Sequence, residues 1–158
     1  MCESGLQEGR KRVVLVNIIC KKRYVIMEEY ESQVFECHQA MELDINSELS
    51  VHLLELRQKL LNEEMGELNV EIDNLLAELR SEGKTTAESR AKMLKELADL
   101  QYVLSGMVVA LGLPMQEVFS RVHKSNMSKL VNGKVLKRAD GKFLKGPNYQ
   151  PPYLQDIA

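Results

Sequence analysis

Apolar side chains recur at alternating intervals of four and three residues between positions 61 and 79, within a stretch that runs from about 47 to 80. On an α-helix this spacing gathers them into one stripe, because 3.6 residues complete a turn. Such a stripe is buried when the helix packs against another element. We therefore predict one long helix whose buried stripe consists of Leu61, Met65, Leu68, Ile72, Leu75 and Leu79.

Capping and turn residues set the bounds of the neighbouring elements. The pattern predicts a short first helix over about 29–41, and residues 44–47 supply capping side chains before the long helix. Gly83 is expected to stop the long helix. Thr85 and Glu88 fit a capping box, which opens a third helix.

The third helix is expected to continue to Leu111, where Gly112 and Pro114 mark a stop and a restart. A fourth helix then reaches about Asn126. Beyond it the helical period is lost, and the turn at 140–141 predicts a small hairpin in an extended tail. The predicted fold is all-α and four-helix-bundle-like, with a short extended C-terminal tail.

Composition agrees with one helical domain. Hydrophobic residues make up 44% of the chain and aromatic residues only 5%, a balance that favours helices over sheets. Near the N-terminus, residues 10–23 hold an apolar run too short to span a bilayer, and no small-residue cleavage site follows it. We expect a disordered or loosely attached extension over 1–26 and the helical domain over 27–158.

The charge is small overall but unevenly distributed. A net charge of −2 gives the chain no electrostatic reason to bind nucleic acid or an anionic membrane. Three cysteines without a CxxC spacing suit a reducing compartment. We therefore expect a cytoplasmic protein with no nucleic-acid or membrane partner. Residues 24–47 carry six acids and no Lys or Arg, whereas residues 121–145 carry eight Lys or Arg and one acid.

Two short acidic motifs carry the candidate chemistry. Glu63, Glu64 and Glu67 lie on the long helix, and Glu96 and Asp99 lie on the third. Carboxylates three residues apart share one side of a helix, with Cβ atoms about 5–6 Å apart. Each pair can hold a hard cation, so two pairs on neighbouring antiparallel helices predict a site for Mg²⁺, with Mn²⁺ as the alternative.

Each of these acids, taken singly, can also be a solvated helix residue paired with a lysine four positions away. Glu96 and Asp99, however, continue a face that becomes apolar at Val103 and Met107, which a solvated face would not do. A di-iron site would require ExxH motifs, which do not occur, and the histidines and cysteines are too few for zinc. The carboxylate–metal interpretation is favoured.

The motif ExxE at 64–67, followed after a gap of 28 residues by ExxD at 96–99, resembles the MazG-like nucleotide pyrophosphohydrolases. This all-α superfamily includes phosphoribosyl-ATP pyrophosphohydrolase and dimeric dUTPases. The resemblance covers about 29–154. Residues 122–129 and 138–147 are similar to segments of the phosphoribosyl-ATP branch.

The resemblance implies hydrolysis between the α and β phosphates of a nucleotide, giving a monophosphate and pyrophosphate. Glu63 matches a family glutamate that helps to orient or deprotonate the attacking water, and Glu64 is grouped with it as catalytic. A bound metal would neutralise phosphate charge and lower the pKa of a water. The implied metal ligands are Glu64, Glu67, Glu96 and Asp99.

Basic residues at the end of the chain are candidates for binding the phosphates. For each of them the alternative is a solvated position in the tail. No GxSxG, Walker or GxGxxG motif occurs, so phosphate binding would depend on carboxylates and metal rather than on a glycine-rich loop. The candidate substrate-binding residues are Lys124, Asn126, Lys129, Arg138 and Lys145.

We favour a nucleoside triphosphate pyrophosphohydrolase, with dUTP, dCTP or a non-canonical nucleotide as substrate. The alternatives are a non-catalytic helical interaction module and a phosphoribosyl-ATP pyrophosphohydrolase, which would share the same site. The third helix is apolar on nearly all sides over 100–111, which predicts a homodimer or homotetramer. Gly66, inside the long helix, suggests a close approach by another helix or a ligand.

Overall fold

The computed structural model describes residues 29–157, and within this range it contains four α-helices and no β-strand. The predicted all-α fold is confirmed. The predicted extension over 1–26 lies outside the described residues. The helices are α1 (Glu29–Ala40), α2 (Val51–Glu82), α3 (Ala87–Leu111) and α4 (Met115–Met127).

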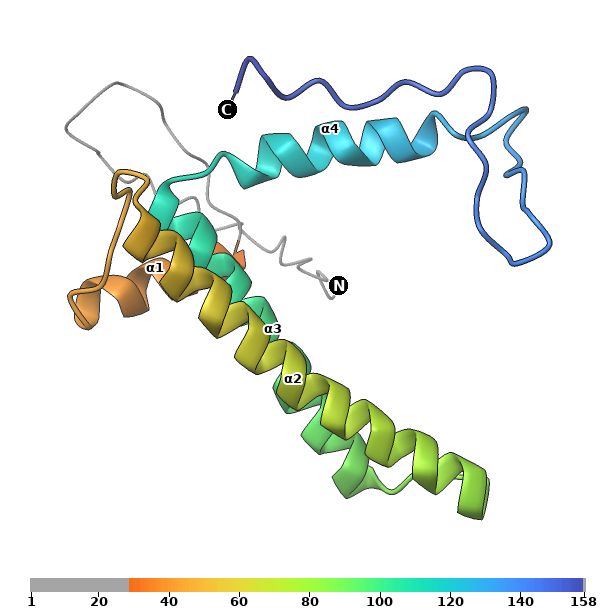
Figure 1. Ribbon diagram of the computed structural model, residues 1–158, viewed down its shortest axis with the longest axis horizontal. Helices are drawn as coiled ribbons and strands as arrows, with labels where there is room; N and C mark the ends of the chain where they lie inside the picture. Colours follow the sequence, from red (N-terminus) through yellow and green to blue (C-terminus); the bar gives the residue numbers. More distant parts are fainter. Residues whose placement is uncertain (1–28, 158) are drawn as a thin grey trace, which may run out of the picture. The chain divides into compact units, whose positions relative to one another are not determined.

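The described chain forms two compact units, one ending at Gly112 and the other beginning at Leu113. In the first unit α2 and α3 run side by side as a long antiparallel hairpin, and α1 packs against α3 (Figure 1). Val34 and Phe35 of α1 pack with Val109 of α3 to form the core of this unit. All five acids of the two predicted motifs lie on the α2–α3 hairpin.

Local hydrogen bonds define the start of both long helices. Ser50 Oγ accepts from the backbone N–H of Leu53 at 3.2 Å, and Thr86 Oγ1 accepts from the N–H of Ser89 at 3.0 Å. The predicted caps at 44–47 and at Thr85 were therefore wrong. Residues 44–47 instead close over the end of α3, because the N–H groups of positions 46 and 47 donate to carbonyls of positions 109 and 110. The left-handed glycines predicted to end α2 and α3 are confirmed at Gly83 and Gly112.

The face of α2 that packs against α3 differs from the predicted stripe. Met65, Ile72 and Leu79 are 45%, 38% and 48% exposed, so their predicted burial was wrong. Of the predicted stripe, only Leu68 and Leu75 also belong to the line of residues that is shielded from solvent. The prediction failed because α2 carries apolar residues on two adjacent lines, and spacing alone does not decide which one meets the neighbour. The shielded line consists of Leu53, Arg57, Leu60, Glu64, Leu68, Glu71, Leu75 and Glu78.

A buried arginine lies in this line, next to a glycine of α3. Arg57 is 6% exposed, and burial lowers its pKa, an effect that Asp44 partly offsets. A Cβ at Gly106 would lie 3.2 Å from Arg57 Nη1 and 3.5 Å from His38 Nε2. Gly106 therefore leaves the space that the guanidinium needs. Gly66 has no such neighbour, since among the described residues no atom lies within 4 Å of where its Cβ would be.

In the second unit the C-terminal tail runs back along α4 (Figure 1). Ser125 Oγ donates to the carbonyl of Gln150 at 2.7 Å, and Arg121 pairs with Asp156. The predicted hairpin is present as a short antiparallel bridge between positions 137 and 143. Side chains of α4 thus hold the tail in place.

No single helix of the described chain is long and apolar enough to cross a membrane. By length and composition, α3 and α4 pass that test only together, as a pair interrupted between Leu111 and Met115.

Candidate metal site

Three carboxylates from α2 and α3 meet in the middle of the hairpin. Oxygen atoms of Glu64, Glu96 and Asp99 all lie within 4.8 Å of one another. The side chain of Glu96 is 13% exposed and that of Asp99 is 40% exposed. The cluster is thus open to solvent on the side of Asp99 and shielded around Glu96.

Contacts near the turn of the hairpin fix which residues of the two helices face each other. Ser89 Oγ donates to Glu78 Oε2 at 2.7 Å, and the N–H of Thr86 donates to the same oxygen at 3.1 Å. About four turns further along α2, Glu64 returns to the same face. Because the helices are antiparallel, that point of α2 lies beside the part of α3 that carries Asp99.

The carboxylates in the cluster oppose one another's ionisation. Burial raises the pKa of Glu64 above its ordinary value, and the charges of Glu67, Asp99 and Glu96 raise it further. Lys95 acts in the opposite direction. Protonation or a bound cation lowers the electrostatic free energy of a carboxylate in this environment.

Lys95 brings a positive charge into the cluster. Its Nζ lies 2.8 Å from Asp99 Oδ2 and 3.0 Å from Glu96 Oε2, and it also lies 3.9 Å from Glu67 Oε2. Hydrogen bonds to Asp99 and Glu96 raise the pKa of Lys95 well above its ordinary value. The sequence analysis did not single out Lys95, although its position four residues before Asp99 on one helix was a usable signal.

Two of the acids predicted to act here lie beside the cluster rather than in it. Glu67 is 60% exposed, its carboxylate lies 3.9 Å from the Lys95 ammonium, and its charge raises the pKa of Glu64. Glu63 is 53% exposed, and its carboxylate lies 3.9 Å from the ammonium of Lys59 on the outer side of α2. The structure thus brings together Glu64, Glu96 and Asp99 and leaves Glu63 and Glu67 outside the group.

The donor set suits a hard divalent cation. Glu64, Glu96 and Asp99 offer only carboxylate oxygens, the ligands that Mg²⁺ and Mn²⁺ prefer. Burial and the neighbouring carboxylates together raise the pKa of Glu64, which is the environment that a bound cation would stabilise. The residues present therefore fit such an ion, with Glu64, Glu96 and Asp99 as its nearest ligands.

The five predicted substrate-binding residues belong to the second unit. Lys129 Nζ donates to Asn126 Oδ1 at 2.6 Å, and Arg138 pairs with Asp140. Lys145 Nζ lies 4.4 Å from the centre of the Tyr149 ring. Lys124 is exposed on the last turn of α4. Their role towards a substrate stays a prediction.

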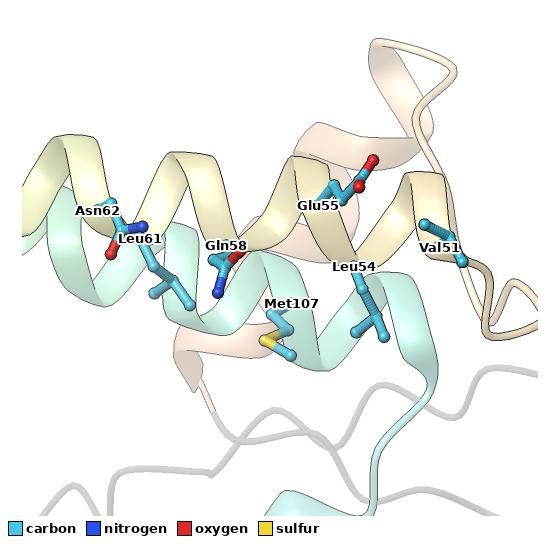
Figure 2. A pocket seen from close by; sticks show the side chains of 7 residues that line it. All are labelled: Val51, Leu54, Glu55, Gln58, Leu61, Asn62 and Met107. Carbon is cyan, nitrogen blue, oxygen red and sulfur yellow. The ribbon is translucent and has the colours of Figure 1, made fainter.

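A shallow groove of about 490 Å³ runs along the N-terminal half of α2. Leu54 and Leu61 of α2 and Met107 of α3 form its apolar part, while Gln58 and Asn62 add amide groups (Figure 2). The groove is open and largely apolar, so it offers a surface for another apolar group rather than a charged one.

Comparison with known families adds independent information. The sequence model described as "Phosphoribosyl-ATP pyrophosphohydrolase" matches residues 34–126, which is more than half of the chain and includes every acid of the cluster. No curated protein matches the chain.

Proposed function

The chain belongs to the phosphoribosyl-ATP pyrophosphohydrolase family, within the MazG-like all-α pyrophosphatase superfamily, and we propose that it hydrolyses a nucleoside triphosphate to the monophosphate and pyrophosphate. We propose Mg²⁺ as the cofactor, with Mn²⁺ able to replace it. A deoxypyrimidine nucleotide such as dUTP or dCTP, or a non-canonical nucleotide, is the substrate that we favour.

One observation carries this proposal: carboxylate oxygens of Glu64, Glu96 and Asp99 converge within 4.8 Å from two different helices. Hydrolysis of a phosphoanhydride needs neutralised phosphate oxygens and a positioned water, not a covalent nucleophile. The bound metal would supply that neutralisation and lower the pKa of a water. Glu64, a member of the cluster whose pKa is raised, would also accept a proton from that water.

The test is a pyrophosphate-release assay over a panel of ribo- and deoxynucleoside triphosphates, with Mg²⁺ and with EDTA. Asp99→Asn should lose metal-dependent turnover while keeping its helix content by circular dichroism. Glu88→Gln is the matched control, because Glu88 lies on the same helix and pairs with Lys92 near the start of α3. Turnover that survives in Asp99→Asn would refute the site. If the folded wild-type chain releases no pyrophosphate from any nucleotide of the panel, the non-catalytic interaction module is favoured.

The matched family gives a second candidate substrate. Phosphoribosyl-ATP carries the same α–β anhydride, and its hydrolysis would use the same carboxylates, so the family description favours it as strongly as any triphosphate. Adding phosphoribosyl-ATP to the panel separates the two: turnover of that compound alone identifies this activity, and turnover of free triphosphates identifies the other.

We propose that the protein acts as a homodimer or homotetramer. The apolar segment of α3 gives part of the reason, since Val108, Val109 and Ala110 are buried within the chain while Tyr102 and Leu104 are exposed. Exposed apolar side chains lie on α3 and on what we call the outer face of α2, which continues from the groove of Figure 2. Its exposed members are Leu54, Met65, Ile72, Leu76 and Leu79, with the half-buried Leu61 between them.

An exposed helical stripe of this length is typical of surfaces that a second copy covers. Light scattering should give a mass of at least two chains, and Met65→Glu together with Ile72→Glu should reduce it. A monomeric wild-type chain at micromolar concentration would contradict the proposal.

A further inference from the structure

The ammonium of Lys95 contacts the same oxygens that a metal would need. Its Nζ lies 2.8 Å from Asp99 Oδ2 and 3.0 and 3.2 Å from the two oxygens of Glu96. An ammonium has three N–H donors and no acceptor, so it saturates carboxylates much as a hard cation does. These three contacts occupy both α3 members of the cluster.

A metal and this ammonium would compete for the same carboxylates. The Glu96 and Asp99 oxygens that accept from Lys95 Nζ would also ligate a hard cation, and the two positive charges would repel each other. The side chain of Lys95 is 62% exposed and its stem is flexible, so the ammonium can leave towards solvent.

We propose that Lys95 is a built-in counter-ion that neutralises the acidic cluster in the metal-free protein and competes with the incoming metal for Glu96 and Asp99. This inference rests on the proposed metal-dependent function. Metal binding is then an exchange of cations. The ion displaces the Lys95 ammonium, which becomes exposed to solvent at the edge of the site. The competition lowers the affinity for metal.

The first test measures metal affinity in the absence of substrate. Mn²⁺ and Mg²⁺ are titrated by calorimetry into the wild type, Lys95→Met, Lys95→Arg and the control Lys92→Met, whose lysine pairs with Glu88 at 3.2 Å away from the cluster. Lys95→Met should bind metal about fivefold more tightly, as expected for losing one exposed competitor. Lys95→Arg should stay near the wild type because it keeps the positive charge, and Lys92→Met should not change.

The second test needs no variant and so does not depend on folding of the mutants. The amines of the wild-type protein are acetylated briefly with and without Mg²⁺, and labelling at each lysine is read by mass spectrometry. Labelling of Lys95 should rise several-fold with Mg²⁺, while labelling of Lys92 should stay constant.

The outcomes separate the two proposals. If the wild type binds metal and Lys95→Met binds it equally or more weakly, the counter-ion role is overturned and the metal site remains. The same conclusion follows if labelling of Lys95 does not change with Mg²⁺. No metal binding by the folded wild type or by any variant overturns the metal dependence of the proposed function together with this inference.

Discussion

Replacing Gly106 by alanine probes a close contact of α3 with α1 and α2. The new Cβ would lie 3.2 Å from Arg57 Nη1 and 3.5 Å from His38 Nε2. Arg57 and His38 are 6% and 3% exposed, so neither can move away without repacking the atoms around it. Overpacking of this kind costs about 1–3 kcal/mol, while alanine in a helix interior gains about 1 kcal/mol over glycine. The net loss of stability should be about 0–2 kcal/mol.

Gly66→Ala is the internal reference for this change. Gly66 lies within α2, and among the described residues no atom lies within 4 Å of its Cβ position, so the substitution should stabilise by about 1 kcal/mol. Helix propensity cancels when the two variants are compared. The difference between them, about 1–3 kcal/mol, isolates the contact with Arg57 and His38.

Urea unfolding followed by circular dichroism measures both variants under one set of conditions. Equal free energies of unfolding for Gly106→Ala and Gly66→Ala would refute the argument, because the clash would then have no energetic effect. A loss of stability in Gly66→Ala that depends on protein concentration would instead reveal a second copy against this part of α2.

Three further predictions follow from single contacts. Glu64→Gln should raise the melting temperature in EDTA, because burial and neighbouring acids raise the pKa of Glu64 and disfavour its ionised form at neutral pH. The same variant should be stabilised less by Mg²⁺ than the wild type. A lower melting temperature in EDTA would contradict this. Hydrogen bonds, above all from Ser89, lower the pKa of Glu78 below its ordinary value of 4.5, so its stabilising effect is complete above that pH and is lost as the pH falls through the folded-state pKa. Glu78→Gln should therefore be less stable than the wild type at pH 7, and the difference should shrink in acid. Free energies of unfolding that differ by the same amount at every pH would exclude this. Gly112→Ala should unfold at a clearly lower urea concentration, with a larger change than Gly106→Ala, because φ is +61° and a Cβ would clash with Asn46 Oδ1. An unfolding midpoint equal to that of the wild type would contradict this.

Much of the fold follows from local signals in the sequence. Gly83 and Gly112 end their helices as predicted, since a left-handed C-terminal residue depends on nearby backbone alone. The spacing of Glu96 and Asp99 likewise places both carboxylates on one side of α3 before any packing is known. The sequence by itself therefore determined the helices, their order and the acidic character of the site.

Only the tertiary structure decided which faces meet. Two apolar lines lie side by side on α2, and the line containing Glu64 packs against α3 while the line containing Met65 stays exposed. That choice depends on the partner helix, which the spacing within α2 does not encode. The same choice draws Glu64 into the cluster, leaves Glu63 outside it and sets Lys95 among the acids. Long-range packing, and not local spacing, thus selects the members of the site from a larger set of candidates.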